Sequence, residues 1–244
     1  MKIIKLLAAA ALGIFFLAGC SDNVTPSNDN ITENVALDLN FAAYPAETGI
    51  VTFQLTPSET DDDPNAPDHE SCYDDDVCYN VTPADITENY GMTVYKFDQD
   101  CASILFYDGE YYTLGICFGG FGADSFAIAD LNGDGCEELY FTFSWGSGMH
   151  RSQVGYFDTA DKTVRIYEYS NFLSDGNWFA EMVLTAEDGK LCVRGADIEI
   201  NSFVDIPLTP EEKIGELIFD GGEIVLNTEA DGETFSPVIF SLTD

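Results

Sequence analysis

The stretch Asp130-Leu-Asn-Gly-Asp-Gly-Cys-Glu-Glu138 places oxygen-bearing side chains at alternate positions of one short loop. Calcium binds about six to eight oxygen atoms, and alternate positions of a loop can curl around a single ion. The candidate ligands are the side chains of Asp130, Asn132, Asp134 and Glu138, together with the backbone carbonyl of Cys136. Gly135 supplies the sharp turn, because glycine adopts positive φ without steric cost. The sequence therefore predicts a calcium site, and the alternative is an Asn-Gly or Asp-Gly hairpin turn that holds no ion.

The residues on either side of this loop indicate β-strands rather than helices. Apolar runs occupy 126–129 and 139–143, and the second run alternates large apolar and polar side chains. The twelfth position of the loop, where an EF-hand needs a bidentate Glu, is Phe141. The predicted site is therefore a strand–loop–strand calcium site.

The same pattern continues along the chain and predicts an all-β domain. From Thr93 onward, short apolar or alternating runs are separated by turns, of which Asp188-Gly189 and Asp220-Gly221-Gly222 are the best hairpin candidates. Thr209-Pro-Glu-Glu212 has capping-box spacing with Pro at the first helical position, so one short helix is expected there. We expect antiparallel strands in irregular, propeller-like blades, with a β-sandwich as the alternative.

The loop Asp130–Glu138 resembles the calcium loop of FG-GAP and VCBS-type β-propeller repeats, and Phe118-Gly-Gly-Phe-Gly-Ala123 is more loosely similar to the residues that give FG-GAP its name. The resemblance covers the segment from Ser125 to Tyr169, which has the size of one blade. It implies a blade with the calcium loop between its first two strands. No second loop matches, so a full set of calcium-bearing blades is excluded.

The first residues have the features of an export signal. Lys2 and Lys5 precede a short apolar run, which predicts a signal peptide over residues 1–19. The sequence Leu17-Ala18-Gly19-Cys20 resembles a bacterial lipobox, which implies cleavage before Cys20 and lipid on its thiol. Residues 20–44 are rich in Ser, Asn, Asp and Thr and are expected to form a flexible tether. The predicted location is the cell envelope or cell surface, with the membrane as partner through the lipid.

The remaining residues, 45–244, form one β-rich domain in this interpretation, with an acidic loop at 57–80. The formal net charge of the whole chain is −35, which argues against binding to nucleic acid through surface charge. The chain has seven cysteines, and six remain if Cys20 is lipidated. An even number in an exported chain favours disulfides, with Cys72–Cys78 as the first candidate and free buried thiols as the alternative.

A second distinctive stretch, Trp145-Gly-Ser-Gly-Met-His-Arg-Ser152, directly follows the strand that leaves the calcium loop. Trp145 could stack on a sugar face, and His150 and Arg151 add a titratable ring and a guanidinium that can clamp a carboxylate. These three residues are the candidate ligand-binding residues. The alternative is structural, with Trp145 packed as core and Arg151 paired with an acidic residue.

Three functions are compatible with these observations. We expect a non-enzymatic, calcium-stabilised surface lipoprotein that binds a glycan or a protein, and the chain resembles uncharacterised surface lipoproteins of Gram-positive gut bacteria. The first alternative is a secreted glycan-acting hydrolase with paired carboxylates, although no catalytic residue can be selected among so many acids. The second is a purely structural envelope protein. The chain has no Gly-x-Ser-x-Gly motif, which argues against a serine hydrolase.

Overall fold

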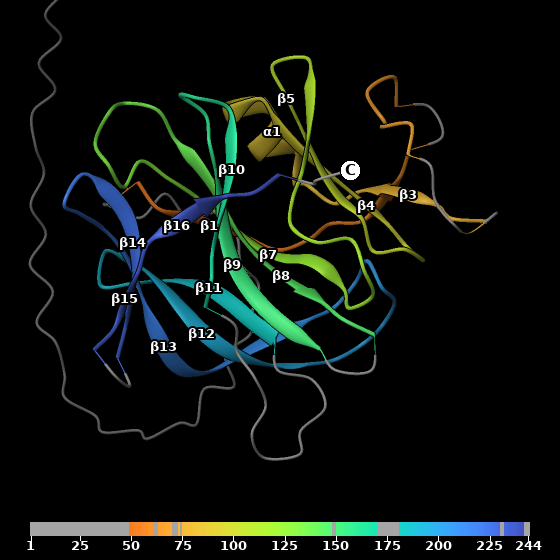
Figure 1. Cartoon of the computed structure of the whole chain (residues 1–244). Coiled ribbons are helices and arrows are strands. Elements are labelled where there is room, and N and C mark those ends of the chain that lie inside the picture. Colours follow the sequence, from red (N-terminus) through yellow and green to blue (C-terminus); the bar gives the residue numbers. More distant parts are fainter. Residues whose placement is uncertain are drawn as a thin grey trace, which may run out of the picture. The chain divides into compact units, whose positions relative to one another are not determined.

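The fold was determined from a computed structural model, which describes residues 49–60, 63–69, 73, 75–147, 150–169, 181–229 and 232–241. These residues form three antiparallel β-sheets and one short α-helix, α1 (Ala84–Tyr90). The all-β class, the antiparallel pairing and the single short helix are thus confirmed for the described part of the chain (Figure 1). Among these residues, no helix is long and apolar enough to cross a membrane.

The central sheet has six strands in the order β1-β7-β8-β9-β10-β16. Its strands are β1 (Val51–Phe53), β7 (Gly122–Ala129), β8 (Glu138–Trp145), β9 (Arg151–Asp158), β10 (Thr163–Tyr167) and β16 (Pro237–Ile239). Strands β7 to β10 are neighbours both in the sequence and in the sheet, so they form a simple meander. The two edge strands of the sheet are β1, from much earlier in the chain, and β16, from much later.

The other two sheets each have five strands that follow one another in sequence. One contains β11 (Glu181–Glu187), β12 (Lys190–Ile198), β13 (Leu208–Asp220), β14 (Glu223–Thr228) and β15 (Thr234–Phe235). The other contains β2 (Ser58–Glu59), β3 (Cys78–Asn80), β4 (Met92–Phe97), β5 (Ser103–Tyr107) and β6 (Glu110–Thr113). The segment 57–80, expected to be a loop, thus contributes two very short strands. Both predicted hairpin turns, at 188–189 and 220–222, connect paired strands.

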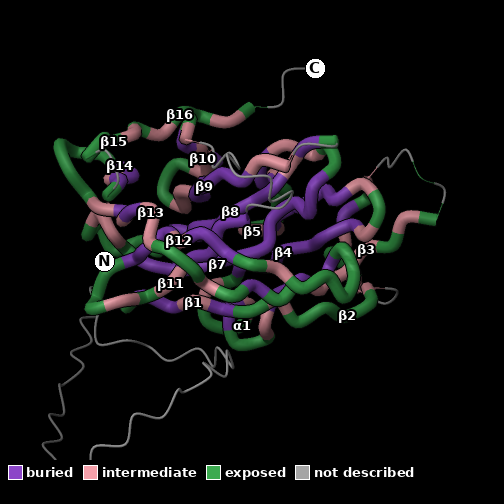
Figure 2. Tube along the Cα trace, turned by 90° about the horizontal axis from the view of Figure 1, so that it is seen from below, coloured by how far each residue is buried: buried purple, intermediate pink, exposed green. Residues whose placement is uncertain are grey.

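The central sheet is covered on both faces because its side chains alternate between two apolar cores. Phe126 and Phe141 belong to a cluster that also contains Val94 and Leu105 of the β2–β6 sheet. Tyr140 and Val154 belong to a second cluster, which is completed by apolar residues of the β11–β15 sheet. Figure 2 shows this burial along β4, β5, β7 and β12. The layered packing corresponds to the sandwich alternative, and the described strands do not show a propeller.

Among the described strands, β11 pairs only with β12, and hydroxyl groups of the central sheet form hydrogen bonds with the backbone groups on its other edge. The backbone N–H of Leu184 donates to Ser125 Oγ at 2.8 Å, and that of Met182 donates to Ser152 Oγ at 3.1 Å. Thr142 Oγ1 lies 3.0 Å from the carbonyl oxygen of Met182. Buried backbone groups must find partners, so these side chains fix β11 against β7, β8 and β9.

The expected helix at Thr209-Pro-Glu-Glu212 is wrong, because these residues lie in strand β13. Their segment of β13 pairs with β12 alone, since β14 pairs only from Gly215 onward. Pro210 therefore has a neighbour on one side only, where its missing N–H is tolerated. The helix forms instead after Thr82-Pro83 and ends at Gly91, whose φ of 66° and N–H bond to the carbonyl of Thr87 cap the helix C-terminus.

Candidate metal centre

The loop between β7 and β8 brings three of the predicted ligands together. Ala129 and Glu138 are the last paired residues of the two strands, so Asp130 and Glu138 stand at the two ends of the loop. One carboxylate oxygen from each of Asp130, Asp134 and Glu138 lies within 4.8 Å of the others. Three carboxylates at this separation can share one hard cation such as calcium.

Asp130 organises the loop through its carboxylate. Its Oδ1 accepts hydrogen bonds from the N–H groups of Gly133 at 2.7 Å and Asp134 at 3.1 Å, and its Oδ2 accepts one from Gly135 at 2.9 Å. Gly133 and Gly135 have φ angles of 72° and 90°, which only glycine adopts readily. The same contacts also occur in turns without an ion, so they explain the shape of the loop but do not identify the cation.

Asn132 contacts the other two acids through its side-chain amide. Its Nδ2 donates to Asp134 Oδ2 at 3.2 Å and to Glu138 Oε1 at 2.9 Å. A cation would require an oxygen at this place, and a half-turn of the amide about its last bond exchanges Nδ2 for Oδ1. Asn132 can therefore serve either as a hydrogen-bond bridge between the acids or as a ligand.

Glu138 is the buried member of the group. It is 1% exposed, and its Oε2 accepts hydrogen bonds from the Tyr140 hydroxyl at 2.8 Å and the Leu131 N–H at 3.3 Å. Burial raises the pKa of Glu138 to about 7, although both hydrogen bonds oppose this shift. The Cys136 side chain is exposed, its N–H donates to Asp134 Oδ1 at 2.8 Å, and its thiol also forms a hydrogen bond with Asp134. The residue therefore lies beside the acids, where its carbonyl could act as a ligand.

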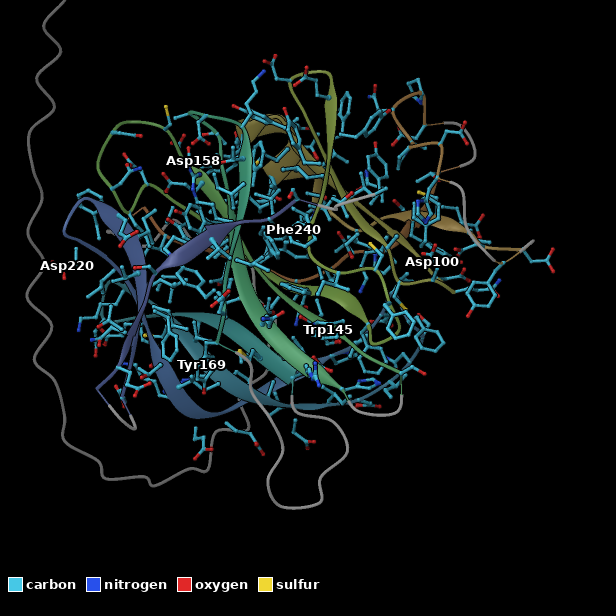
Figure 3. All side chains as sticks on the ribbon, in the orientation of Figure 1. Asp100, Trp145, Asp158, Tyr169, Asp220 and Phe240 are labelled. Atoms are coloured by element: carbon cyan, nitrogen blue, oxygen red, sulfur yellow. The ribbon has the colours of Figure 1, made fainter. Side chains whose placement is uncertain are left out.

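Of the predicted ligand-binding residues, Trp145 (labelled in Figure 3) ends β8, at the opposite end of that strand from Glu138, and His150 and Arg151 stand where β9 begins. Trp145 and Arg151 are paired across β8 and β9, and the Arg151 guanidinium lies 4.8 Å from the centre of the Trp145 ring. Trp145 Nε1 donates to Gln153 Oε1 at 3.0 Å. One face of the indole is thus covered by a cation, which favours the packing interpretation over stacking on a sugar.

His150 does not join this pair and instead faces inward. Its ring packs edge-on against Phe121, with ring centres 5.2 Å apart, and its Nδ1 lies 3.6 Å from Glu181 Oε1. Burial lowers the pKa of His150. Its neighbourhood is therefore a buried acidic group rather than an open ligand site.

No local sequence pattern predicts this buried group, which contains Lys96, Asp124 and Glu181. The three residues come from β4, β7 and β11, one from each sheet, and each is less than 5% exposed. Among 44 acidic residues, Asp124 and Glu181 have no distinguishing local pattern. Lys96 offered the one usable signal, because it is a rare cation inside the otherwise charge-free strand Met92–Phe97.

The described cysteines, at positions 78, 101, 117, 136 and 192, form no disulfide. Cys72 lies outside the residues that the structure describes, as does Cys20, so the pair Cys72–Cys78 stays a prediction. No protein-family model matches this chain, and neither the curated proteins nor the solved structures give a match.

Proposed function

We propose that the chain is an exported lipoprotein whose β domain is stabilised by calcium at the β7–β8 loop. The observation that carries this proposal is the convergence of the Asp130, Asp134 and Glu138 carboxylates at the mouth of that loop. The lipid on Cys20 would hold the domain outside the membrane, where it could meet a glycan or a protein partner. No group of described residues singles out a hydrolase, so we propose a non-catalytic role.

The negative charge of the three carboxylates is the physical reason to expect a bound calcium ion. Three carboxylates within 4.8 Å repel one another unless a cation or protons neutralise them. A divalent cation would remove most of this repulsion and would fix the ends of β7 and β8, two inner strands of the central sheet. Oxygen ligands of this kind suit calcium better than zinc, which binds chiefly nitrogen and sulfur.

Chelation of calcium is expected to lower the melting temperature of the wild-type protein by roughly 1–7 °C. Extracellular modules bind calcium with Kd values on the order of 10⁻⁴–10⁻³ M. At about 2 mM calcium, mass action then adds about 0.6–1.8 kcal/mol to the free energy of unfolding. Differential scanning calorimetry with EDTA, calcium and magnesium measures this, and calcium should restore the melting temperature better than magnesium does.

The matched variants are Asp130→Ala in the loop and Asp220→Ala in the exposed β13–β14 turn. Asp130→Ala should no longer respond to calcium, because Asp130 both supplies a carboxylate and holds three backbone N–H groups. Asp220→Ala should respond as the wild type does. The calcium proposal fails if the wild type binds no calcium in titration calorimetry, or if Asp130→Ala keeps the full response.

The Cys20→Ala variant is expected to lose its membrane attachment when the full chain is produced in a bacterium with lipoprotein processing. It should appear in the medium or periplasm, or accumulate with its signal peptide uncleaved, because no thiol is available for the acyl chains that anchor a lipoprotein. Fractionation and mass spectrometry measure both outcomes. Attachment of the variant to the membrane at the mature mass would contradict the lipid anchor.

A further inference from the structure

A buried amine and two buried carboxyl groups meet where the three sheets come together. Lys96 is 0% exposed, Asp124 is 4% exposed and Glu181 is 0% exposed. Lys96 Nζ has no hydrogen-bond partner among the described residues, whereas the Asp124 and Glu181 carboxyl groups form a side-chain hydrogen bond with each other. Buried polar atoms are nearly always hydrogen-bonded, so this arrangement calls for a chemical explanation.

The backbone register places Lys96 beside Asp124. Lys96 pairs with Ser103 across β4 and β5, and Ser103 Oγ accepts a 2.9 Å hydrogen bond from the N–H of Ala123, the residue before Asp124. Among the charges near Lys96, Asp124 acts on its amine most strongly, and Cys101 and Glu181 follow.

Hydrogen bonds of Thr142 connect Asp124 to β11, the strand that begins with Glu181. The Thr142 Oγ1 atom lies 2.8 Å from Asp124 Oδ1 and 3.0 Å from the carbonyl oxygen of Met182, the residue after Glu181. A hydroxyl has one proton, and the carbonyl of Met182 can only accept. The Thr142 hydroxyl therefore shares its proton between Asp124 Oδ1 and the Met182 carbonyl. Asp124 also forms a side-chain hydrogen bond with Glu181, and two carboxyl groups can be hydrogen-bonded only if one of them carries a proton.

The low polarity of this site favours uncharged forms of the reacting groups. Burial raises the pKa of Asp124 well above its usual value, and the nearby Glu181 adds to the rise. Burial also lowers the pKa of Lys96 to about 8, which brings a neutral amine within reach near physiological pH. A neutral amine and a protonated carboxyl are the forms that condense to an amide.

We propose that Lys96 and Asp124 form a side-chain amide bond, with Glu181 as the base. The Lys96 ammonium first gives a proton to the Glu181 carboxylate. The neutral Nζ then attacks Cγ of the protonated Asp124, and transfer of a second nitrogen proton to the departing hydroxyl releases it as water. One C–N bond forms, one C–O bond breaks, one water leaves, and Glu181 ends protonated, so no oxidant, cofactor or metal is needed.

The bond would join β4 to β7 and thus tie the β2–β6 sheet to the central sheet. It would also remove an unpaired amine from the interior, where such a group costs free energy. An exported domain whose described cysteines form no disulfide would gain a covalent link of another kind.

Mass spectrometry of the folded full-length protein tests this proposal directly. After reduction, digestion with a glutamyl endopeptidase should yield a branched peptide that joins the Lys96 segment to the Asp124 segment and is lighter by one water than their sum. Trypsin should fail to cleave after Lys96. Lys96→Arg and Asp124→Ala should lose the branched peptide, Glu181→Gln should form it more slowly or not at all, and the exposed-site control Lys190→Arg should keep it.

The wild-type digest alone decides the question, so the result does not depend on whether the variants fold. The proposal is overturned if Lys96 and Asp124 appear only in linear peptides of full mass. It is also overturned if the lost water belongs to a linear peptide, as in a succinimide at Asp124, or if the branch joins Lys96 to Glu181.

Discussion

Phe141→Ala is expected to lower the free energy of unfolding by about 3–5 kcal/mol, the usual range for loss of a fully buried phenylalanine. Phe141 is 0% exposed and lies on β8, near the middle of the central sheet. It is opposite Phe126 on one neighbouring strand and Gly155 on the other. A Cβ on Gly155 would lie 2.7 Å from the tip of the Phe141 ring, so the ring fills the space above this glycine. The truncation would leave a cavity there.

Urea denaturation followed by circular dichroism measures this loss, and Phe219→Ala is the matched control. Phe219 is also on a strand, but it is 48% exposed, so its truncation should cost about 1 kcal/mol or less. Equal losses in the two variants would show that Phe141 is not in the core. The packing of the central sheet against the β2–β6 sheet would then be wrong.

Gly122→Ala is expected to be nearly as damaging, with a loss of about 2–5 kcal/mol. Gly122 begins β7 with a φ of 67°, and a Cβ there would lie 2.2 Å from the backbone carbonyl oxygen of Cys101. The left-handed conformation alone costs an L-residue roughly 1–2 kcal/mol. The clash adds roughly 1–3 kcal/mol, because the carbonyl belongs to the backbone and cannot rotate away.

Gly221→Ala separates these two contributions. Gly221 has a similar φ of 60° in the β13–β14 turn, but no atom lies within 4 Å of the Cβ that the substitution would add. This variant should lose only the conformational part, about 1–2 kcal/mol. The same loss in both variants would contradict the close approach of β7 to the chain at Cys101.

The part of the fold that depends on neighbouring residues could be predicted from the sequence. The meander β7–β10 and the hairpin turns follow from local apolar alternation and from Asp-Gly and Gly-Gly pairs. The helix could not be placed, because Thr82-Pro83 and Thr209-Pro210 both start with a helix signal. The second segment forms a strand instead, because it pairs with β12, which precedes it in the chain.

The two candidate sites differ in the same respect, because one is formed by residues close in the sequence and the other by residues far apart in it. The carboxylates of Asp130, Asp134 and Glu138 are brought together by one loop, so their spacing in the sequence was sufficient to predict the group. Lys96, Asp124 and Glu181 meet only because three sheets pack together. Sequence alone carries no information on that packing when acidic residues are so numerous.

The hydroxyl groups that cover the edge of β11 also bear on how copies of this protein behave toward one another. A free strand edge offers a row of N–H and C=O groups to which a second chain can add, and this is a common route to aggregation. Here the backbone groups of Met182 and Leu184 in that row are already hydrogen-bonded to the hydroxyls of Ser125, Thr142 and Ser152. Replacement of these hydroxyls by alanine would therefore weaken the domain and also expose a template for edge-to-edge association between molecules.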